Sequence, residues 1–172
     1  MTPPEAQSSS SDVAVSSTCG KINISPEEFH ELRASASAAK ATAHCPYSRF
    51  RVGAAVLVAN GSVVAGANVE NASYPVGLCA ERVALSKAVT DGTWSASSST
   101  SAFRAIAVST DISPPASPCG MCRQFIREFC PLSMPVIMFD KNDEYVVLTL
   151  EELLPMSFGP DQLPPAGAPG AP

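Results

Sequence analysis

The sequence has no long apolar run and few basic residues, and each shortage disfavours a class of protein. No apolar stretch is long enough to cross a bilayer, so no transmembrane helix is expected. The start lacks a basic region followed by an apolar run, so no secretory signal is expected. The formal net charge of -5 disfavours nucleic-acid binding, which depends on Lys and Arg neutralising phosphates. We therefore expect a cytoplasmic protein that binds neither membranes nor nucleic acid.

The composition predicts one folded domain between two tails. The 172 residues, of which 45% are hydrophobic and 16% are charged, are enough to bury a core. Residues 1–20 are rich in serine, and residues 164–172 consist mainly of proline, glycine and alanine. Neither segment carries the large apolar side chains that packing requires. We predict disordered tails over these two segments and a folded domain over residues 21–163.

Apolar spacing and turn residues predict an α/β fold. Asn60-Gly61 separates two β-branched apolar runs, which is a strong hairpin signal. The fourth and fifth strands are only about four residues apart, too few for a parallel crossover, so they should be antiparallel. We expect a three-layer α/β/α sandwich around a mixed five-stranded sheet. The predicted strands are 52–59, 62–68, 103–109, 135–140 and 145–149, and the predicted helices are 25–44, 79–90, 120–130 and 151–154.

Three of the six cysteines predict a zinc site. Cys119 and Cys122 are spaced so that one turn can present both sulfurs to a metal ion, and Cys79 can complete the set. Three protein ligands leave the fourth tetrahedral position of zinc open for water, as in catalytic sites. Each of these segments stands where a loop becomes a helix, and the helix dipole there favours thiolate. We therefore expect one Zn²⁺ per subunit.

The residues beside the cysteines suggest how such a site could work. Glu81 is not needed as a ligand, so it is free to take a proton from the zinc-bound water and pass it to a ring nitrogen and a leaving amine. Three thiolates and Zn²⁺ carry a net charge of -1, which weakens the acidity of the bound water. Arg82 or Arg123 could draw off that charge by hydrogen bonding to the sulfurs. This pattern is typical of a zinc-dependent hydrolytic deaminase.

A Cys-x-x-Cys element could also form a structural zinc knuckle or a redox pair. A structural zinc needs a fourth Cys or His at matching spacing, and the sequence offers no second close pair. The remaining candidates are expected to be inert thiols or to have no metal role: Cys19, Cys45, Cys130, His30 and His44.

Five blocks of the sequence, in the right order, resemble the cytidine deaminase family in its free-nucleoside, homotetrameric form. The blocks are residues 45–55, 68–74, 77–82, 117–124 and 153–160. The resemblance runs from about Ser25 to about Leu163. It implies hydrolysis of cytidine or deoxycytidine to uridine or deoxyuridine with release of ammonia, a reaction of pyrimidine salvage. It also implies that a zinc-activated hydroxide attacks C4 of cytosine while Glu81 moves the protons.

The resemblance further implies which residues bind the nucleoside. Asn68 and Glu70 match the ribose-binding pair, and Phe50 matches the aromatic residue that packs on the pyrimidine. The backbone N–H of Ala80 matches a donor to the pyrimidine carbonyl. Without the resemblance, Asn68 would be interpreted as a turn residue at a strand end and Phe50 as ordinary core.

Three further matches imply an assembly. Ala72, Tyr74 and Phe158 match residues that complete the pocket of a neighbouring subunit, and the expectation of a homotetramer depends on them. Gln124, in the same block as the paired cysteines, is expected to support the metal ligands. His44 departs from the family pattern, which often has Tyr at this position.

Three alternatives remain open. A related deaminase acting on another cytosine-containing compound would share the zinc and Glu81 but not the pair of Asn68 and Glu70. A polynucleotide-editing deaminase tends to have a histidine ligand where Cys79 stands and a parallel fifth strand. A zinc-stabilised binding module would have no use for an unliganded Glu81.

Overall fold

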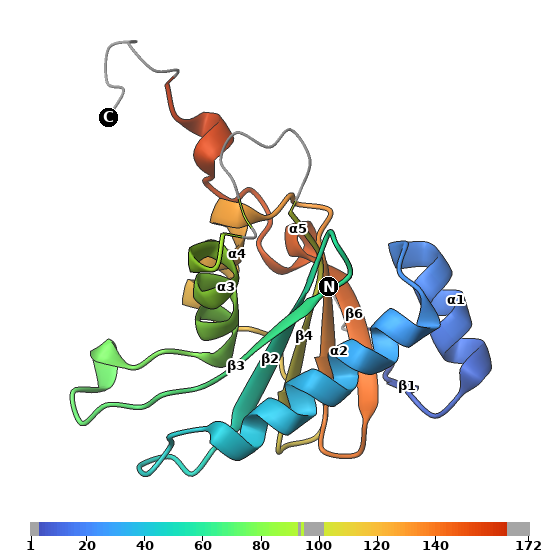
Figure 1. Cartoon of the computed structure of the whole chain (residues 1–172), viewed down its shortest axis with the longest axis horizontal. Helices are drawn as coiled ribbons and strands as arrows, with labels where there is room; N and C mark the ends of the chain where they lie inside the picture. Colours follow the sequence, from blue (N-terminus) through green and yellow to red (C-terminus); the bar gives the residue numbers. More distant parts are fainter. Residues whose placement is uncertain (1–3, 93, 95–101, 165–172) are drawn as a thin grey trace.

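The computed structural model describes residues 4–92, 94 and 102–164. Within these ranges the strands form one sheet in the order β1-β6-β5-β4-β2-β3 (Figure 1). β4 and β5 are parallel, whereas all other neighbouring strands are antiparallel. The strands are β1 Gln7–Ser8, β2 Val52–Val58, β3 Val63–Ala67, β4 Phe103–Thr110, β5 Pro135–Phe139 and β6 Glu144–Thr149.

Helices cover both faces of this sheet, so the predicted three-layer α/β/α arrangement is observed. α1 and α2 pack with one buried apolar cluster, and α3, α4 and α5 pack with the other. In Figure 1, α2 crosses the sheet on the side where α1 lies, and α3 and α4 stand together next to β3. The α-helices are α1 Asp12–Ile22, α2 Pro26–Ala39, α3 Ala80–Thr90, α4 Gly120–Phe129 and α5 Leu150–Leu153. Short 3₁₀ turns follow at Lys40–Thr42, Tyr74–Val76 and Pro160–Gln162.

Local capping chemistry explains where two of the helices begin. The Ser25 hydroxyl accepts a hydrogen bond from the Glu28 N–H, and the Glu28 carboxylate accepts one from the Ser25 N–H, which is a capping box. Thr149 and Glu152 form the same motif at the start of α5. Both boxes follow the pattern Ser/Thr-x-x-Glu, which predicts a helix start from the sequence.

The hairpin of β2 and β3 is also confirmed. Gly61 has φ +86°, a backbone conformation that glycine adopts without strain, and the Val58 N–H donates to the Ser62 carbonyl at 2.8 Å. The short connection after β5 returns the chain as antiparallel β6, the pairing that its length predicts. The predicted total of five strands is wrong, because β1 adds a sixth strand beside β6.

The predicted disordered tail over residues 1–20 is wrong from Gln7 onward. β1 pairs with β6, and α1 buries Val15 and Cys19 against the core. The buried Thr18 hydroxyl lies 2.9 Å from the Tyr145 hydroxyl, which ties the helix to β6. The serine-rich composition hides this helix, because a few well-spaced apolar residues are enough to anchor it.

The predicted proline- and glycine-rich tail lies outside the described residues from residue 165 onward, as do residues 95–101. None of the helices in the described ranges has the length and apolar character needed to span a membrane.

Candidate active site

The three predicted metal ligands meet where α3 and α4 begin. Cys79 and Cys119 are the residues that precede the first turns of the two helices, and Cys122 lies in the first turn of α4. The sulfur of Cys119 lies 3.9 Å from that of Cys79 and 3.5 Å from that of Cys122. All three sulfurs lie within 4.8 Å of one another. Tetrahedral zinc with Zn–S bonds of about 2.3 Å separates its sulfurs by about 3.8 Å, so this set fits zinc.

The electrostatics of the three thiols favour a bound cation. Hydrogen bonding with the Cys122 thiol, helped by Arg82, lowers the pKa of Cys79 to about 5. The same pairing, together with burial, raises the pKa of Cys122. Once one thiol of the pair is ionised, ionising the other costs additional free energy. A divalent cation between the sulfurs would offset that cost with its positive charge, and its binding releases the thiol protons.

Arg82 lies beside the sulfurs, where the sequence predicts it. Its Nη2 donates to the Gly77 carbonyl at 2.9 Å and lies 4.0 Å from the Cys79 sulfur. Its Nε is buried and has no hydrogen-bond partner among the described residues. The guanidinium is thus placed to offset the negative charge of the thiolates.

The hydrogen bonds of Arg123 differ from the bonds to the ligand sulfurs that the sequence suggested. Its guanidinium donates to the Pro118 carbonyl at 2.7 Å and to the Leu153 carbonyl at 2.6 Å. It also donates to the Ser117 hydroxyl at 2.7 Å. These bonds hold the segment that precedes Cys119 against the end of α5. Arg123 therefore fixes the position of a ligand without hydrogen bonding to a sulfur in the described part of the chain.

Glu81 is buried in the first turn of α3, with 4% of its surface exposed. It lines the same cavity as Cys79 and Cys119. Burial raises the pKa of its carboxyl, because the charged form loses hydration. A carboxyl of this kind holds a proton more readily than an exposed one, which suits general acid–base chemistry.

One cavity of about 450 Å³ joins the metal ligands to the predicted nucleoside-binding residues. This volume lies within the range typical of small-molecule sites. The lining includes Phe50, Asn68, Glu70, Tyr74, Cys79, Glu81, Arg82 and Cys119. The structure therefore brings residues from four of the five sequence blocks around one space.

Asn68 and Glu70 stand at the end of the cavity near β3. The Asn68 amide accepts from the Val52 N–H at 2.8 Å and donates to the Phe50 carbonyl at 2.9 Å. It thereby fixes the start of β2, which is the structural role that the sequence also allowed.

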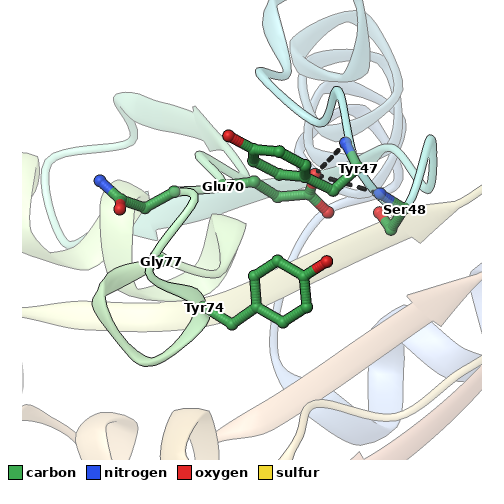
Figure 2. Close-up of a pocket in the computed structure, with 6 residues that line it drawn as sticks. Tyr47, Ser48, Glu70, Tyr74 and Gly77 are labelled. Atoms are coloured by element: carbon green, nitrogen blue, oxygen red, sulfur yellow. Dashed lines mark hydrogen bonds between the residues drawn. The ribbon is translucent and has the colours of Figure 1, made fainter.

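The Glu70 carboxylate, drawn in Figure 2, accepts from the backbone N–H groups of Tyr47 at 2.9 Å and Ser48 at 3.2 Å. Hydrogen bonding by Ser48 is the main cause that lowers the pKa of Glu70. Figure 2 shows the ring of Tyr74 on the other side of the adjoining pocket that these residues line.

Four of the predicted binding and supporting residues are not among the described residues that line the cavity of their own chain: Ala72, Gln124, Phe158 and the fully buried Ala80. Ala72 is exposed and Phe158 is 60% exposed. The Gln124 amide donates to the Phe158 carbonyl at 2.9 Å. Gln124 thus holds the segment around Phe158, and its one observed side-chain bond does not reach a metal ligand.

The sequence patterns do not predict two further residues that line the cavity. Val108 and Thr110, at the end of β4, line it together with Val52. The signal that could have identified them is their position at the end of a strand, from which the chain leads to the segment that carries Cys119.

The fold and site define an α/β protein with three sulfurs placed to bind a metal ion beside a cavity of small-molecule size. Comparison with known proteins gives the family. Residues 26–138 match the family model described as "Cytidine and deoxycytidylate deaminase zinc-binding region". The chain belongs to the cytidine and deoxycytidylate deaminase family, and its domain is a deaminase domain, as the five sequence blocks predict.

Individual relatives align with this chain over most of their own length. A cytidine deaminase of Sporosarcina psychrophila is 42% identical over 136 residues, which is 79% of this chain and 95% of the relative. A cytidine deaminase of Halalkalibacterium halodurans is 45% identical over 120 residues, 70% of this chain and 86% of the relative. The crystal structure of cytidine deaminase from Burkholderia pseudomallei superposes with a TM-score of 0.69 at 40% identity, covering 75% of this chain and 98% of that one.

Proposed function

We propose that this chain hydrolyses free cytidine and deoxycytidine to uridine and deoxyuridine with release of ammonia, as a step of pyrimidine salvage. The observation that carries the proposal is the single cavity that joins the cysteine cluster and Glu81 to the pair of Asn68 and Glu70. The relatives named cytidine deaminase support the choice of substrate. The antiparallel pairing of β6 and the third cysteine at Cys79 disfavour a polynucleotide-editing enzyme.

One zinc ion per subunit would be held by Cys79, Cys119 and Cys122. When bound, zinc supplies a water acidic enough to act as a nucleophile toward C4 of cytosine at neutral pH. Arg82, beside the Cys79 sulfur, offsets the excess negative charge of three thiolates.

Glu81 carries the protons in this proposal. Its carboxylate accepts a proton from the attacking water and gives it to the ring nitrogen of cytosine. It then takes the remaining proton from the same oxygen, now bonded to C4, and gives it to the amine, which leaves as ammonia. The buried carboxyl in the first turn of α3, two residues after Cys79, supports this role because it lines the cavity at the metal end.

The other cavity residues orient the nucleoside. Asn68 and Glu70 bind the ribose hydroxyls. Both backbone bonds to Glu70 use one carboxylate oxygen, so the second is available to a hydroxyl. Phe50 packs on the pyrimidine. The N–H of Ala80, at the first position of α3, has no partner in the helix and can donate to the pyrimidine carbonyl.

We also propose that the enzyme is a homotetramer in which Ala72, Tyr74 and Phe158 complete the cavities of neighbouring subunits. Tyr74 is 74% exposed although it lines the cavity, and Met121 is exposed there as well. Exposed apolar side chains gathered at one site are typical of surfaces that other subunits cover. Gln124 supports this arrangement by holding the Phe158 carbonyl.

A cytoplasmic location completes the proposal. All six cysteines are free, including the three that would bind zinc. A reducing compartment keeps such thiols available to the metal.

The test is a spectroscopic assay on the purified protein. Conversion of the cytosine ring to uracil changes its ultraviolet absorbance, which can be followed with cytidine and with deoxycytidine. We expect turnover of both substrates, loss of turnover after treatment with a zinc chelator, and recovery on addition of Zn²⁺. Zinc-loaded protein that converts neither nucleoside would disprove the proposed function.

A further inference from the structure

The α5 loop, residues 155–163, has little backbone attachment to the rest of the fold. It follows α5 and contains no strand or α-helix. The Gln162 N–H donates to the Gly159 carbonyl at 3.0 Å, and the Leu163 N–H donates to the Pro160 carbonyl at 3.2 Å. Among the described residues these are the backbone-to-backbone hydrogen bonds of the loop, and both stay within it. Side chains must therefore determine where the α5 loop lies.

Two side chains of α4 supply this attachment. The Gln124 amide donates to the Phe158 carbonyl at 2.9 Å. Arg127 Nε donates to the Ser157 hydroxyl at 3.3 Å, and its Nη2 forms an ion pair with the Asp161 carboxylate. Residues three apart on a helix share one face, so a single face of α4 holds the loop at three points.

Arg127 is buried and fits closely against Gly159. Only 10% of the Arg127 side chain is exposed. Gly159 is also buried, and a Cβ added there would overlap the atoms of the Arg127 guanidinium. A buried cation loses hydration, so it needs hydrogen-bond partners, and those of Arg127 lie in the loop. The absence of a side chain at position 159 leaves the space that the guanidinium fills.

This contact sets the direction of the Phe158 ring. Gly159 has an extended backbone, with φ −149° and ψ 176°. Successive side chains of an extended chain point to opposite sides. The Ser157 side chain and position 159 both contact Arg127, so the ring between them points away from α4. Its exposed fraction of 60% agrees with this direction.

The same helix also fixes the metal ligands. Arg123 of α4 holds the segment before Cys119 by donating to the Pro118 carbonyl at 2.7 Å. Arg127, one turn further along, holds the α5 loop. One rigid helix therefore sets both the position of the ligand sulfurs and the direction of the Phe158 ring.

We propose that Arg127 is the positioning residue for Phe158, directing the ring outward to complete the cavity of a neighbouring subunit. The inference rests on the proposed function, in which Phe158 serves a neighbour's cavity. Arg127 itself contacts no substrate. Loosening its contact with the loop should therefore weaken nucleoside binding and leave kcat and zinc content unchanged.

The first experiment displaces the loop without touching either Arg127 or Phe158. In Gly159→Ala the new methyl group must push the loop away from the guanidinium. We expect KM for cytidine to rise about five- to tenfold, which is the usual effect of losing an aromatic anchor from an interface. The ultraviolet assay gives kcat and KM, and metal analysis gives the zinc content.

Gly20→Ala is the matched control. It adds the same methyl group on α1, where no atom lies within 4 Å of the new Cβ. We expect kcat and KM of this variant to equal those of wild type.

Substitutions of the ion pair test Arg127 directly. Arg127→Lys keeps a charge that can pair with Asp161 but cannot donate from a planar fork, and Arg127→Gln removes the charge. We expect KM to rise less in Arg127→Lys than in Arg127→Gln. Asp161→Asn changes a side chain that is 66% exposed, and KM should rise by up to about fivefold.

A double variant separates positioning from a merely structural role. Gly159→Ala combined with Phe158→Ala should have the KM of Phe158→Ala alone, because both substitutions remove one contact. Additive effects on KM would mean that the guanidinium contact acts on something other than the ring.

Mixed oligomers test whether the ring serves a neighbour. Gly159→Ala subunits, which keep Glu81, are co-expressed with Glu81→Gln subunits, which keep an intact α5 loop. Purification by two different tags isolates the mixed oligomers. Their KM should return toward the wild-type value, because intact rings from the Glu81→Gln subunits complete the active cavities. Partner subunits that carry both Glu81→Gln and Phe158→Ala are the control and should restore nothing.

The outcomes separate this inference from the proposed function. Zinc-loaded wild type without turnover would reject the proposed function. With an active wild type, the inference would be overturned by an unchanged KM in Gly159→Ala, or by mixed oligomers whose KM is the same with either partner. If Gly159→Ala does not fold, Asp161→Asn takes its place in the mixed oligomers, and the same two outcomes decide.

Discussion

Several side chains around the cavity hold the fold and face the ligand at the same time. The Asn68 amide fixes the backbone at Phe50 and Val52 while it lines the cavity. Arg82 holds the Gly77 carbonyl and lies beside the Cys79 sulfur. Substitutions here disturb both functions, so informative variants must change one atom type and keep the shape.

Glu81→Gln is such a variant. It keeps the size of the side chain but removes the group that accepts and returns protons. We expect the variant to hold zinc and to lose turnover by about 10²- to 10⁴-fold, the usual contribution of a general acid–base residue. Metal analysis and the ultraviolet assay measure the two quantities.

The exposed Glu128→Gln on α4 is the control and should keep wild-type turnover. Deamination by Glu81→Gln within tenfold of wild type would show that the proton route runs elsewhere.

Cys119→Ala tests the metal ligands. Removal of one of three sulfurs should cost the protein its zinc and lower its melting temperature, because metal binding contributes folding free energy. The control is Cys130→Ala: Cys130 is buried and stands outside the three-sulfur cluster, and burial raises its pKa to about 12. This control should keep its zinc. One zinc per chain in Cys119→Ala would contradict the assigned ligand set.

At the scale of single residues, the sequence predicts those residues whose role follows from their spacing along the chain. Cys79 and Glu81 stand two positions apart at a helix start, and local geometry alone brings both toward the cavity. Gln124 and Thr110 could not be placed in this way. The direction of the Gln124 amide depends on where residue 158 packs, and the place of Thr110 in the cavity lining depends on the pairing of β4 with its neighbours.

Elements with a strong local signal were predicted well. The capping boxes at the starts of α2 and α5 and the Asn60-Gly61 hairpin depend on residues within one turn of each other. α1 has no such dense signal. Its stability comes from contacts with β6 and the α2 side of the core, which are distant in the sequence, so composition alone suggests a tail.

Two valines of α1 test whether this helix belongs to the folded unit. Val15 is 1% exposed, and Val13, on the same helix, is 83% exposed. Val15→Ala should lower the free energy of unfolding by about 2 kcal/mol, from the lost apolar burial and the cavity left behind. Val13→Ala should change it little.

Urea unfolding of both variants measures this difference. Equal stability of the two variants would mean that α1 does not pack against the core in solution. Deamination of cytidine should be the same in both, because α1 lies on the opposite side of the sheet from the cavity.

At the scale of the whole molecule, the core is covered by helices, whereas the cavity has exposed apolar side chains at its edge. Helices cover both faces of the sheet, yet Tyr74 and Met121 remain exposed at the cavity, and Phe158 is exposed outside it. The reaction is favoured when bulk water is excluded from the cavity, and a wall that is open to solvent does not exclude it. Other subunits would close that wall, so activity and assembly should depend on the same residues.

Phe158→Ala tests this dependence. Loss of the ring should weaken the proposed tetramer and raise KM for cytidine by about tenfold or more, because a buried aromatic anchor at an interface contributes about 2 kcal/mol or more. Sedimentation velocity gives the oligomeric state, and steady-state kinetics give KM. Val13→Ala, which also truncates an exposed apolar residue but on the α1 side, should change neither. An unchanged tetramer with unchanged KM in Phe158→Ala would remove Phe158 from the site and with it the main support for shared cavities.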